Sequence, residues 1–585
     1  MWQFWDTLLT QFSIPINFEV IKMRINDYVQ FILFVALLIA ITPPLGGFMA
    51  KIFQGEKTWM HKPLGWLESL TYKVSGIDPK EEMTWKAYAW AFMIFHIVGI
   101  IVLMFFQMAQ SWLPLNPQNL PNVSWHSALN TAVSFITNTN WQAYTPEATM
   151  SYLTQMAALA VQNFLSAACG IAIAIALTRG IARRSTSSIG NFWVDATRAT
   201  VYLLLPICIV YTLFLVAQGM VQTFAPYVDV VTLEGVKQTI ALGPVASQVA
   251  IKMLGTNGGG FFNANASHPF ENPTALSNFV QMFSIFAISA ALTYTYGTMT
   301  KSRKHGWVIF GAMLTLFIGF TAISLASEYM TNPVFNQAGI MEGKETRFGV
   351  FNSVFFSTIT TSASCGAVNA MHASLSPLSG GIAMLNMMIG EVIFGGVGAG
   401  LYGMLLFVLM TVFIAGLMVG RTPEYMGKKI EGKEMTMVIL AILAPCAVIL
   451  IGTGISVVAP AALSSLSNKG PHGFSELLYA FTSAAANNGS AFAGLNANTV
   501  YLNVMLAIAM FLGRFAIIIP LLAVAGSLAQ KKYSPPSSGT FETDTGLFAL
   551  LLIGVILIVS ALTFLPGLSL GPIVEHLIML KGQTF

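Results

Sequence analysis

Four stretches of small and polar residues carry the most distinctive chemistry of this sequence. They cover residues 137–142, 255–260, 362–367 and 484–490. Each follows a moderately apolar run that is too short to cross a membrane as a helix. When the ends of the stretches are aligned, one column at near-equal intervals contains Asn140, Gly258, Gly366 and Gly489. This spacing predicts a fourfold internal repeat.

These stretches have the residue types that a monovalent-cation filter needs. Small residues let backbones approach closely, and glycine allows carbonyl groups to point inward. A ring of backbone carbonyls can replace the hydration shell of an ion, and the C-termini of the preceding short helices would favour a cation. The segments 137–145, 254–265, 361–372 and 483–495 contain no Asp or Glu. A filter for divalent cations normally uses a carboxylate ring, so the loops favour potassium over calcium or magnesium.

Amide side chains are frequent in the same loops, at Asn138, Asn140, Gln142, Asn257, Asn487 and Asn488. They either add oxygen ligands or hold the loops by hydrogen bonds, and the sequence does not separate these two roles. Amphipathic helices in ordinary extracellular loops are the alternative reading of each stretch. Four such stretches at near-equal spacing favour the pore-loop interpretation.

The elements that must position these loops are membrane spans. The chain has 585 residues, of which 55% are hydrophobic and 9% charged, whereas soluble proteins carry about 25% charged residues. Segments of roughly 20 apolar residues predict ten spans, at about 28–50, 86–109, 152–178, 192–220, 275–298, 306–328, 379–419, 435–460, 499–527 and 546–566. The seventh is too long and too rich in glycine for one simple helix, so we expect it to break.

Lys and Arg are concentrated in alternate loops, which predicts that both termini lie outside. The loop 109–151 has no Lys or Arg, as expected of an external loop. The predicted fold is an all-α polytopic membrane protein with four pseudo-fourfold span–pore helix–loop–span repeats. The predicted units are an N-terminal extension (1–27), a leading span (28–50), repeats at 86–178, 192–298, 306–419 and 435–527, and a trailing span with the C-terminus (546–585).

Glu391 and Arg514 are the two charged residues that lie most clearly within predicted spans. Such residues are costly in a membrane, usually face the protein interior and often pair. We hypothesise that they face each other near the exit of the filter, either as a structural salt bridge or on the ion path. Gly396 and Gly398 belong to the expected break, which would obstruct straight-through flow. Lys252 ends the second short helix, where it suits the helix dipole and is not expected to be a ligand.

The loop sequences TNTNWQ (137–142), GTNGGGFFN (255–263), TSASCGAVNAM (361–371) and NNGSAF (487–492) closely resemble those of the KdpA family. So do GEVIFGGVGAGLYGM (390–404) and GRTPEYMGKKI (420–430). The resemblance implies the fold of the superfamily of potassium transporters and a place in a bacterial plasma membrane complex with KdpB, KdpC and KdpF. It also implies that potassium is the transported ligand, that KdpB hydrolyses ATP, and that potassium leaves the filter sideways through a tunnel toward KdpB.

In that family the positions of Gln142, Gly258, Gly366 and Gly489 affect potassium selection. The predicted potassium filter comprises Thr137, Asn138, Thr139, Asn140, Gln142, Thr256, Asn257, Gly258, Gly259, Ser364, Cys365, Gly366, Asn487, Asn488 and Gly489. The resemblance also favours contact between Arg421 and a cytoplasmic partner.

Other function classes fit less well. The sequence contains no G-x-x-x-x-G-K-[ST] phosphate loop and no Asp-Lys-Thr-Gly-Thr motif, so we expect a non-hydrolysing subunit without an organic cofactor. A stand-alone potassium channel or symporter of the same fold is the first alternative. The segments 379–419 and 420–430 argue against it. A secondary transporter of organic solutes would show inverted repeats around a midplane site, and a membrane enzyme would need a catalytic constellation that we do not find.

Overall fold

The computed structural model describes residues 23–418, 420, 422–535 and 541–584. In this part of the chain, ten helical segments are long and apolar enough to cross a membrane, which confirms the predicted polytopic helical fold. They are α2 (Ile25–Gln54), α4 (Trp85–Met108), α7 with its preceding turn (Thr154–Ala182), α8 to α9 (Phe192–Ala217), α11 (Ala275–Met299), α12 (Arg303–Tyr329), α15 (Ala399–Met418), α16 (Gly432–Ser456), α19 (Val500–Gln530) and α20 to α21 (Gly546–Leu580).

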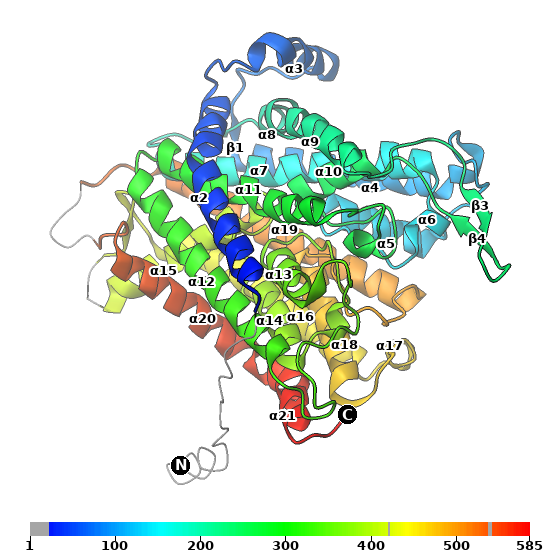
Figure 1. Cartoon of the computed structure of the whole chain (residues 1–585). Helices are drawn as coiled ribbons and strands as arrows, with labels where there is room; N and C mark the ends of the chain where they lie inside the picture. Colours follow the sequence, from blue (N-terminus) through cyan, green and yellow to red (C-terminus); the bar gives the residue numbers. More distant parts are fainter. Residues whose placement is uncertain (1–22, 419, 421, 536–540, 585) are drawn as a thin grey trace, which may run out of the picture.

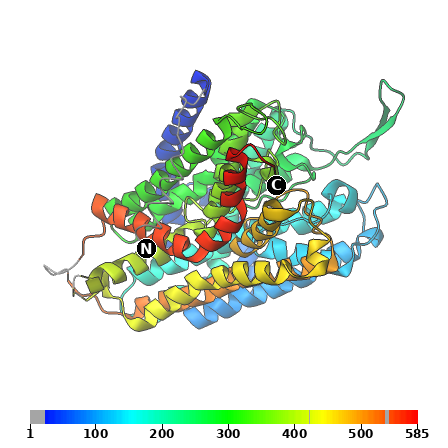
Figure 2. The same ribbon diagram turned by 90° about the horizontal axis from the view of Figure 1, so that it is seen from below.

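Shorter elements connect these spans. The short helices are α3 (His61–Ser75), α5 (Trp125–Ile136), α6 (Pro146–Thr149), α10 (Val245–Leu254), α13 (Gly349–Ser362), α14 (Pro377–Met388), α17 (Pro460–Leu463) and α18 (Gly470–Ala486). Among the described residues, three antiparallel strand pairs lie in the loops: β1 (Met83–Thr84) with β2 (Ser188–Gly190), β3 (Val228–Val231) with β4 (Lys237–Ile240), and β5 (Glu424–Tyr425) with β6 (Lys428–Lys429). The β3–β4 hairpin projects from the helical body in both views (Figures 1 and 2).

The spans differ in how much of their surface the protein itself covers. In α7 and α11, 78% and 72% of the most apolar stretch is buried, whereas in α2, α4 and the α20–α21 segment the share is 22% to 28%. Apolar side chains left exposed on a spanning helix are available to lipid or to a partner subunit. The two central helices therefore form the interior, and the other three lie at the perimeter. Figure 2 shows α4, α16 and α19 side by side along one edge of the molecule.

The long apolar run 379–419 is two helices, α14 and α15, joined by a non-helical segment of residues 389–398. Glu391 and Phe394 have left-handed backbones there (φ 49° and 45°), as do Gly390 and Gly398. Left-handed residues cannot continue a right-handed helix, so the helix ends at Met388 and restarts at Ala399. Irregular backbone at membrane depth is tolerated only where protein or a cavity surrounds it, and this segment is almost entirely buried.

Candidate functional site

The helices α5, α10, α13 and α18 each precede one of the four loops that the sequence singles out. Each of them ends where its loop begins, with cap residues Thr137, Gly255, Ala363 and Asn487. The predicted filter residues are buried, apart from Gln142 and Gly489, which are partly exposed. The C-terminal ends of four short helices are thus placed next to buried loop backbone, where their partial negative charges favour a cation.

The four loops share one backbone pattern. Left-handed φ angles occur at Asn138 and Asn140 (67° and 55°), Thr256 and Gly258 (49° and 89°), Ser364 and Gly366 (54° and 76°), and Asn487 and Gly489 (61° and 101°). The second residue of each pair belongs to the column obtained by aligning the four stretches of this sequence with one another. A positive φ is unusual for a β-branched residue such as Thr256, and backbone strain of this kind concentrates at functional sites.

The loops contact one another in a closed ring. A Cβ atom added to Gly258 would overlap the Cys365 carbonyl oxygen of the third loop. One added to Gly366 would overlap the Asn488 carbonyl oxygen of the fourth loop, and one added to Gly489 would overlap the Thr139 carbonyl oxygen of the first. The Asn138 amide completes the circle, because its Nδ2 donates to the Thr256 carbonyl oxygen of the second loop at 3.0 Å.

Amide and hydroxyl side chains hold the ring together. Besides the Asn138 bond, Ser364 Oγ donates to the Asn487 carbonyl oxygen at 2.9 Å, and Asn487 Nδ2 donates to Thr139 Oγ1 at 3.1 Å. The Gln142 side chain bonds both backbone groups of Gly260, accepting from its N–H at 2.9 Å and donating to its carbonyl at 3.2 Å. The sequence left open whether these side chains add oxygen ligands or hold the loops by hydrogen bonds. These contacts support the second role.

Further predicted loop residues form contacts within and between the loops and with α7. Asn140 Nδ2 donates to Asn163 Oδ1 at 2.6 Å, and Asn257 Nδ2 donates to Asn138 Oδ1 at 2.6 Å. Thr137 and Thr139 join their hydroxyl groups at 2.7 Å. Gly259 lies against the Asn140 side chain. Side-chain bonding thus extends from the ring into the helix α7, which contains Asn163.

The non-helical segment 389–398 lies directly against the ring. A Cβ atom added to Gly396 would contact both Ser364 and Thr256, and the Val397 N–H donates to Thr256 Oγ1 at 3.0 Å. Gly398 packs on the Gly170 carbonyl oxygen of α7, too closely for any side chain. The break is therefore held between the second and third loops and the central helix.

Glu391 and Arg514 line the same cavity next to this segment, together with Asn487 and Tyr402. No ion pair joins these two residues, so of the two alternatives the salt bridge is not formed, whereas a place on the ion path stays a prediction. Glu391 Oε1 accepts from Asn488 Nδ2 at 2.8 Å, and Arg514 Nη1 donates to the Tyr402 hydroxyl at 3.3 Å. The reason is geometric: Glu391 lies on the non-helical segment and is held by the fourth loop, whereas Arg514 projects from the middle of α19.

One cluster of functional interest was not predicted. Lys252 forms a completely buried ion pair with Glu271, and both contact the second loop. The signal for it was the presence of Lys252 on a short intramembrane helix, because a buried charge needs a partner. The hypothesised partner contact of Arg421 lies outside the described residues.

Comparison with known proteins supports a single family. A family model described as KdpA, the potassium-transporting ATPase A subunit, matches residues 32–577. A potassium-transporting ATPase potassium-binding subunit of Methylobacterium radiotolerans is 58% identical over 96% of this chain and 99% of its own length. One from Mesorhizobium japonicum is also 58% identical, over 96% of this chain and 100% of its own. Among solved structures, the potassium transporter TrkH of Vibrio parahaemolyticus is 15% identical, with a TM-score of 0.49. The match covers 74% of this chain and 84% of the TrkH chain.

Proposed function

The chain belongs to the KdpA family of potassium-transporting ATPase A subunits, and from that premise we propose how it selects potassium and passes it on. It is the potassium-binding subunit of such an ATPase and does not itself hydrolyse ATP. Its task in the complex is to take up potassium and deliver it to the subunit that hydrolyses ATP. The finer assignments of residues below are our proposals.

The four-loop ring is the potassium filter. Potassium loses its hydration shell on entering the ring, and loop oxygens replace the water. The ring discriminates between ions because its loops are bonded to one another and cannot close around a smaller ion without breaking these bonds. The single observation that carries this proposal is the closed ring of left-handed loop residues, in which three glycines pack against carbonyl oxygens of the neighbouring loop.

The segment 389–398 beneath the ring prevents free flow. An open path would let potassium run down its gradient, which a pump cannot tolerate. Potassium instead turns sideways into the cavity that Glu391 and Arg514 line. The Glu391 side chain offers a cation an oxygen ligand and the Arg514 guanidinium repels it, so the cavity can admit potassium without holding it tightly.

We further propose that the partners are KdpB, KdpC and KdpF, with ATP bound by KdpB alone, and that Arg421 contacts a cytoplasmic partner. The membrane is the bacterial plasma membrane, and both termini lie outside the cytoplasm. The excess of Lys and Arg in alternate loops supports this orientation.

The test is potassium-stimulated ATP hydrolysis by the complex, purified through a tag on this chain. We expect partner subunits to co-purify, potassium and not sodium to stimulate hydrolysis, and a Gly258→Asp variant to need far more potassium. Purification of the chain alone, without ATPase activity but with potassium flux in liposomes, would instead identify a channel of the same fold.

A further inference from the structure

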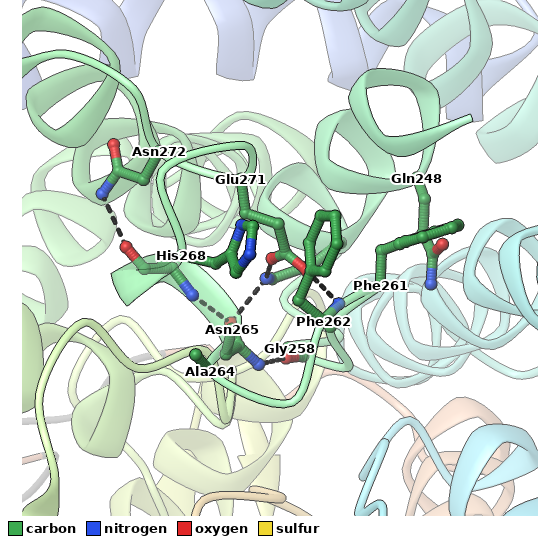
Figure 3. A network of polar contacts seen from close by, with 12 residues as sticks. Gln248, Gly258, Phe261, Phe262, Ala264, Asn265, His268, Glu271 and Asn272 are labelled. Atoms are coloured by element: carbon green, nitrogen blue, oxygen red, sulfur yellow. Dashed lines mark hydrogen bonds and ion pairs between the residues drawn. The ribbon is translucent and has the colours of Figure 1, made fainter. Parts of the chain in front are cut away.

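Behind the second loop, a buried polar cluster connects a charged pair to the ring. The side chains of Lys252 and Glu271 are 0% exposed and form an ion pair. Lys252 Nζ also donates to Asn265 Oδ1 at 2.5 Å, and Asn265 Nδ2 donates to the Gly258 carbonyl oxygen at 2.7 Å. Figure 3 shows Asn265 bonded to Gly258 on one side and facing Glu271 on the other.

The same cluster restrains the second loop at further points. The Lys252 carbonyl oxygen accepts from the Asn257 N–H at 2.8 Å and from the Gly258 N–H at 3.3 Å. Glu271 Oε1 accepts from the Phe262 N–H at 2.8 Å. The N–H and the carbonyl of Gly258 are therefore both held, so the peptide groups on either side of it cannot rotate freely.

Packing alone would not favour a buried cluster with this composition. Removing two charges from water carries a large desolvation penalty, and well-packed apolar residues are often at least as stable. An isolated ion pair of this kind could act as a clasp between α10 and residues 261–272. That explanation does not account for Asn265, whose amide donates to the carbonyl of Gly258, the glycine that packs on the Cys365 carbonyl oxygen.

We propose that Asn265, held by the Lys252–Glu271 pair, is a positioning residue that sets the direction of the Gly258 carbonyl and thereby the potassium preference of the ring. A carbonyl oxygen has two lone pairs, so it can accept from Asn265 and still face a cation. The proposal rests on the proposed function, because it assigns a role within the same filter. Glu271 has a second role, which is to neutralise a lysine charge that would otherwise repel potassium from behind the loop.

The experiment measures half-saturating potassium and maximal rate in potassium-stimulated ATP hydrolysis by the whole complex, with sodium and rubidium as competitors. The main variant is Asn265→Leu, which removes the donor to Gly258 and the acceptor for Lys252. Leucine also strains the left-handed backbone of residue 265 (φ 52°), so a shift counts for the proposal only if Glu271→Gln, which leaves that backbone unchanged, shifts the potassium requirement in the same direction. The matched control is Asn272→Leu. Asn272 is buried in the same segment, but its Nδ2 donates to the Ala266 carbonyl oxygen at 3.1 Å and to Asn278 Oδ1 at 2.9 Å, away from the ring.

We expect Asn265→Leu to raise half-saturating potassium about five- to tenfold, the factor that one net hydrogen bond supplies, and to weaken discrimination against sodium. The maximal rate should change little, since the ATP-hydrolysing subunit is untouched. Asn272→Leu should leave the potassium requirement near that of the wild type. Equal shifts in the two variants, or no shift in either, would overturn the proposal.

If Asn265→Leu fails to assemble, Glu271→Gln decides. This change keeps the size of the side chain and an oxygen for the Phe262 N–H but leaves Lys252 without its counter-charge, so half-saturating potassium should rise. An unchanged requirement in an assembled Glu271→Gln complex would refute the proposal. A wild-type complex that potassium does not stimulate would instead refute the proposed function, so the two failures are distinguishable.

Discussion

Replacing Gly366 with alanine tests one of the close contacts that join the loops of the ring. Gly366 has a φ of 76°, and an added Cβ would lie closer than 3.0 Å to the Asn488 carbonyl oxygen of the neighbouring loop. Cβ atoms essentially never approach so closely, so the third and fourth loops must separate. The left-handed backbone adds about 1–2 kcal/mol for a residue with a Cβ atom.

The magnitude follows from these two effects. If the ring opens to relieve the strain, potassium binding must restore the closed geometry. This costs at least the free energy of placing alanine in a left-handed backbone. About 1–2 kcal/mol corresponds to a five- to thirtyfold rise in half-saturating potassium. Sodium discrimination should weaken as well, because a loosened ring can adapt to a smaller ion. The assay is ATP hydrolysis by the purified complex over a range of potassium concentrations, with and without sodium.

Gly311→Ala is the matched control. Gly311 lies in α12, where an added Cβ meets no atom within 4 Å and the backbone is helical. Alanine stabilises a helix relative to glycine by about 1 kcal/mol, so this variant should assemble and keep the wild-type potassium requirement. An assembled Gly366→Ala complex with unchanged half-saturating potassium and unchanged sodium discrimination would show that the ring does not select the ion.

Three further outcomes are expected. Shortening residues 394–400 should increase passive potassium flux in liposomes, because this segment lies against the ring; an unchanged leak would contradict its role as an obstruction. Exchanging the charges of Glu391 and Arg514 should not rescue the single variants, since the two form no ion pair, and full recovery of activity would show that they act as one. Burial lowers the pKa of His472, but its hydrogen bond to Glu575 and the negative charges of Glu575 and Glu476 together raise it more, so the net shift is upward. The stabilising contribution of this pair is therefore complete below the unfolded pKa of about 6.5 and is lost as pH rises through the folded value. The gap in melting temperature between wild type and His472→Gln should accordingly narrow at alkaline pH, and a gap independent of pH would show that the contact is uncharged.

The positions of the spans could be predicted because hydropathy is a local property. A stretch such as 275–298 is apolar enough to be recognised on its own, and it forms α11 from Ala275 to Met299. The column of Asn140, Gly258, Gly366 and Gly489 was also visible, because the small residues recur at near-equal intervals. Whether these residues bind potassium remains a prediction until the ATPase experiment is done.

The contacts within the site could not be predicted in the same way. The sequence placed Glu391 and Arg514 within spans and suggested that they pair, yet Glu391 bonds to Asn488 and Arg514 to Tyr402. The Asn138 side chain donates to the Thr256 carbonyl oxygen in another loop, a partner that the sequence did not indicate. Each of these partners is far away in the sequence, so no local pattern identifies it.

By itself, the sequence determined that the chain has ten stretches apolar enough to cross a membrane and where four similar loops lie between them, because apolar length and runs of small residues are properties of short stretches. Only the tertiary structure decided which loops touch, how the segment 389–398 lies against them and that Asn265 connects a buried ion pair to Gly258. The physical reason is that hydrogen bonds and close packing depend on atoms within a few ångströms, and the folding of the whole chain decides which atoms those are.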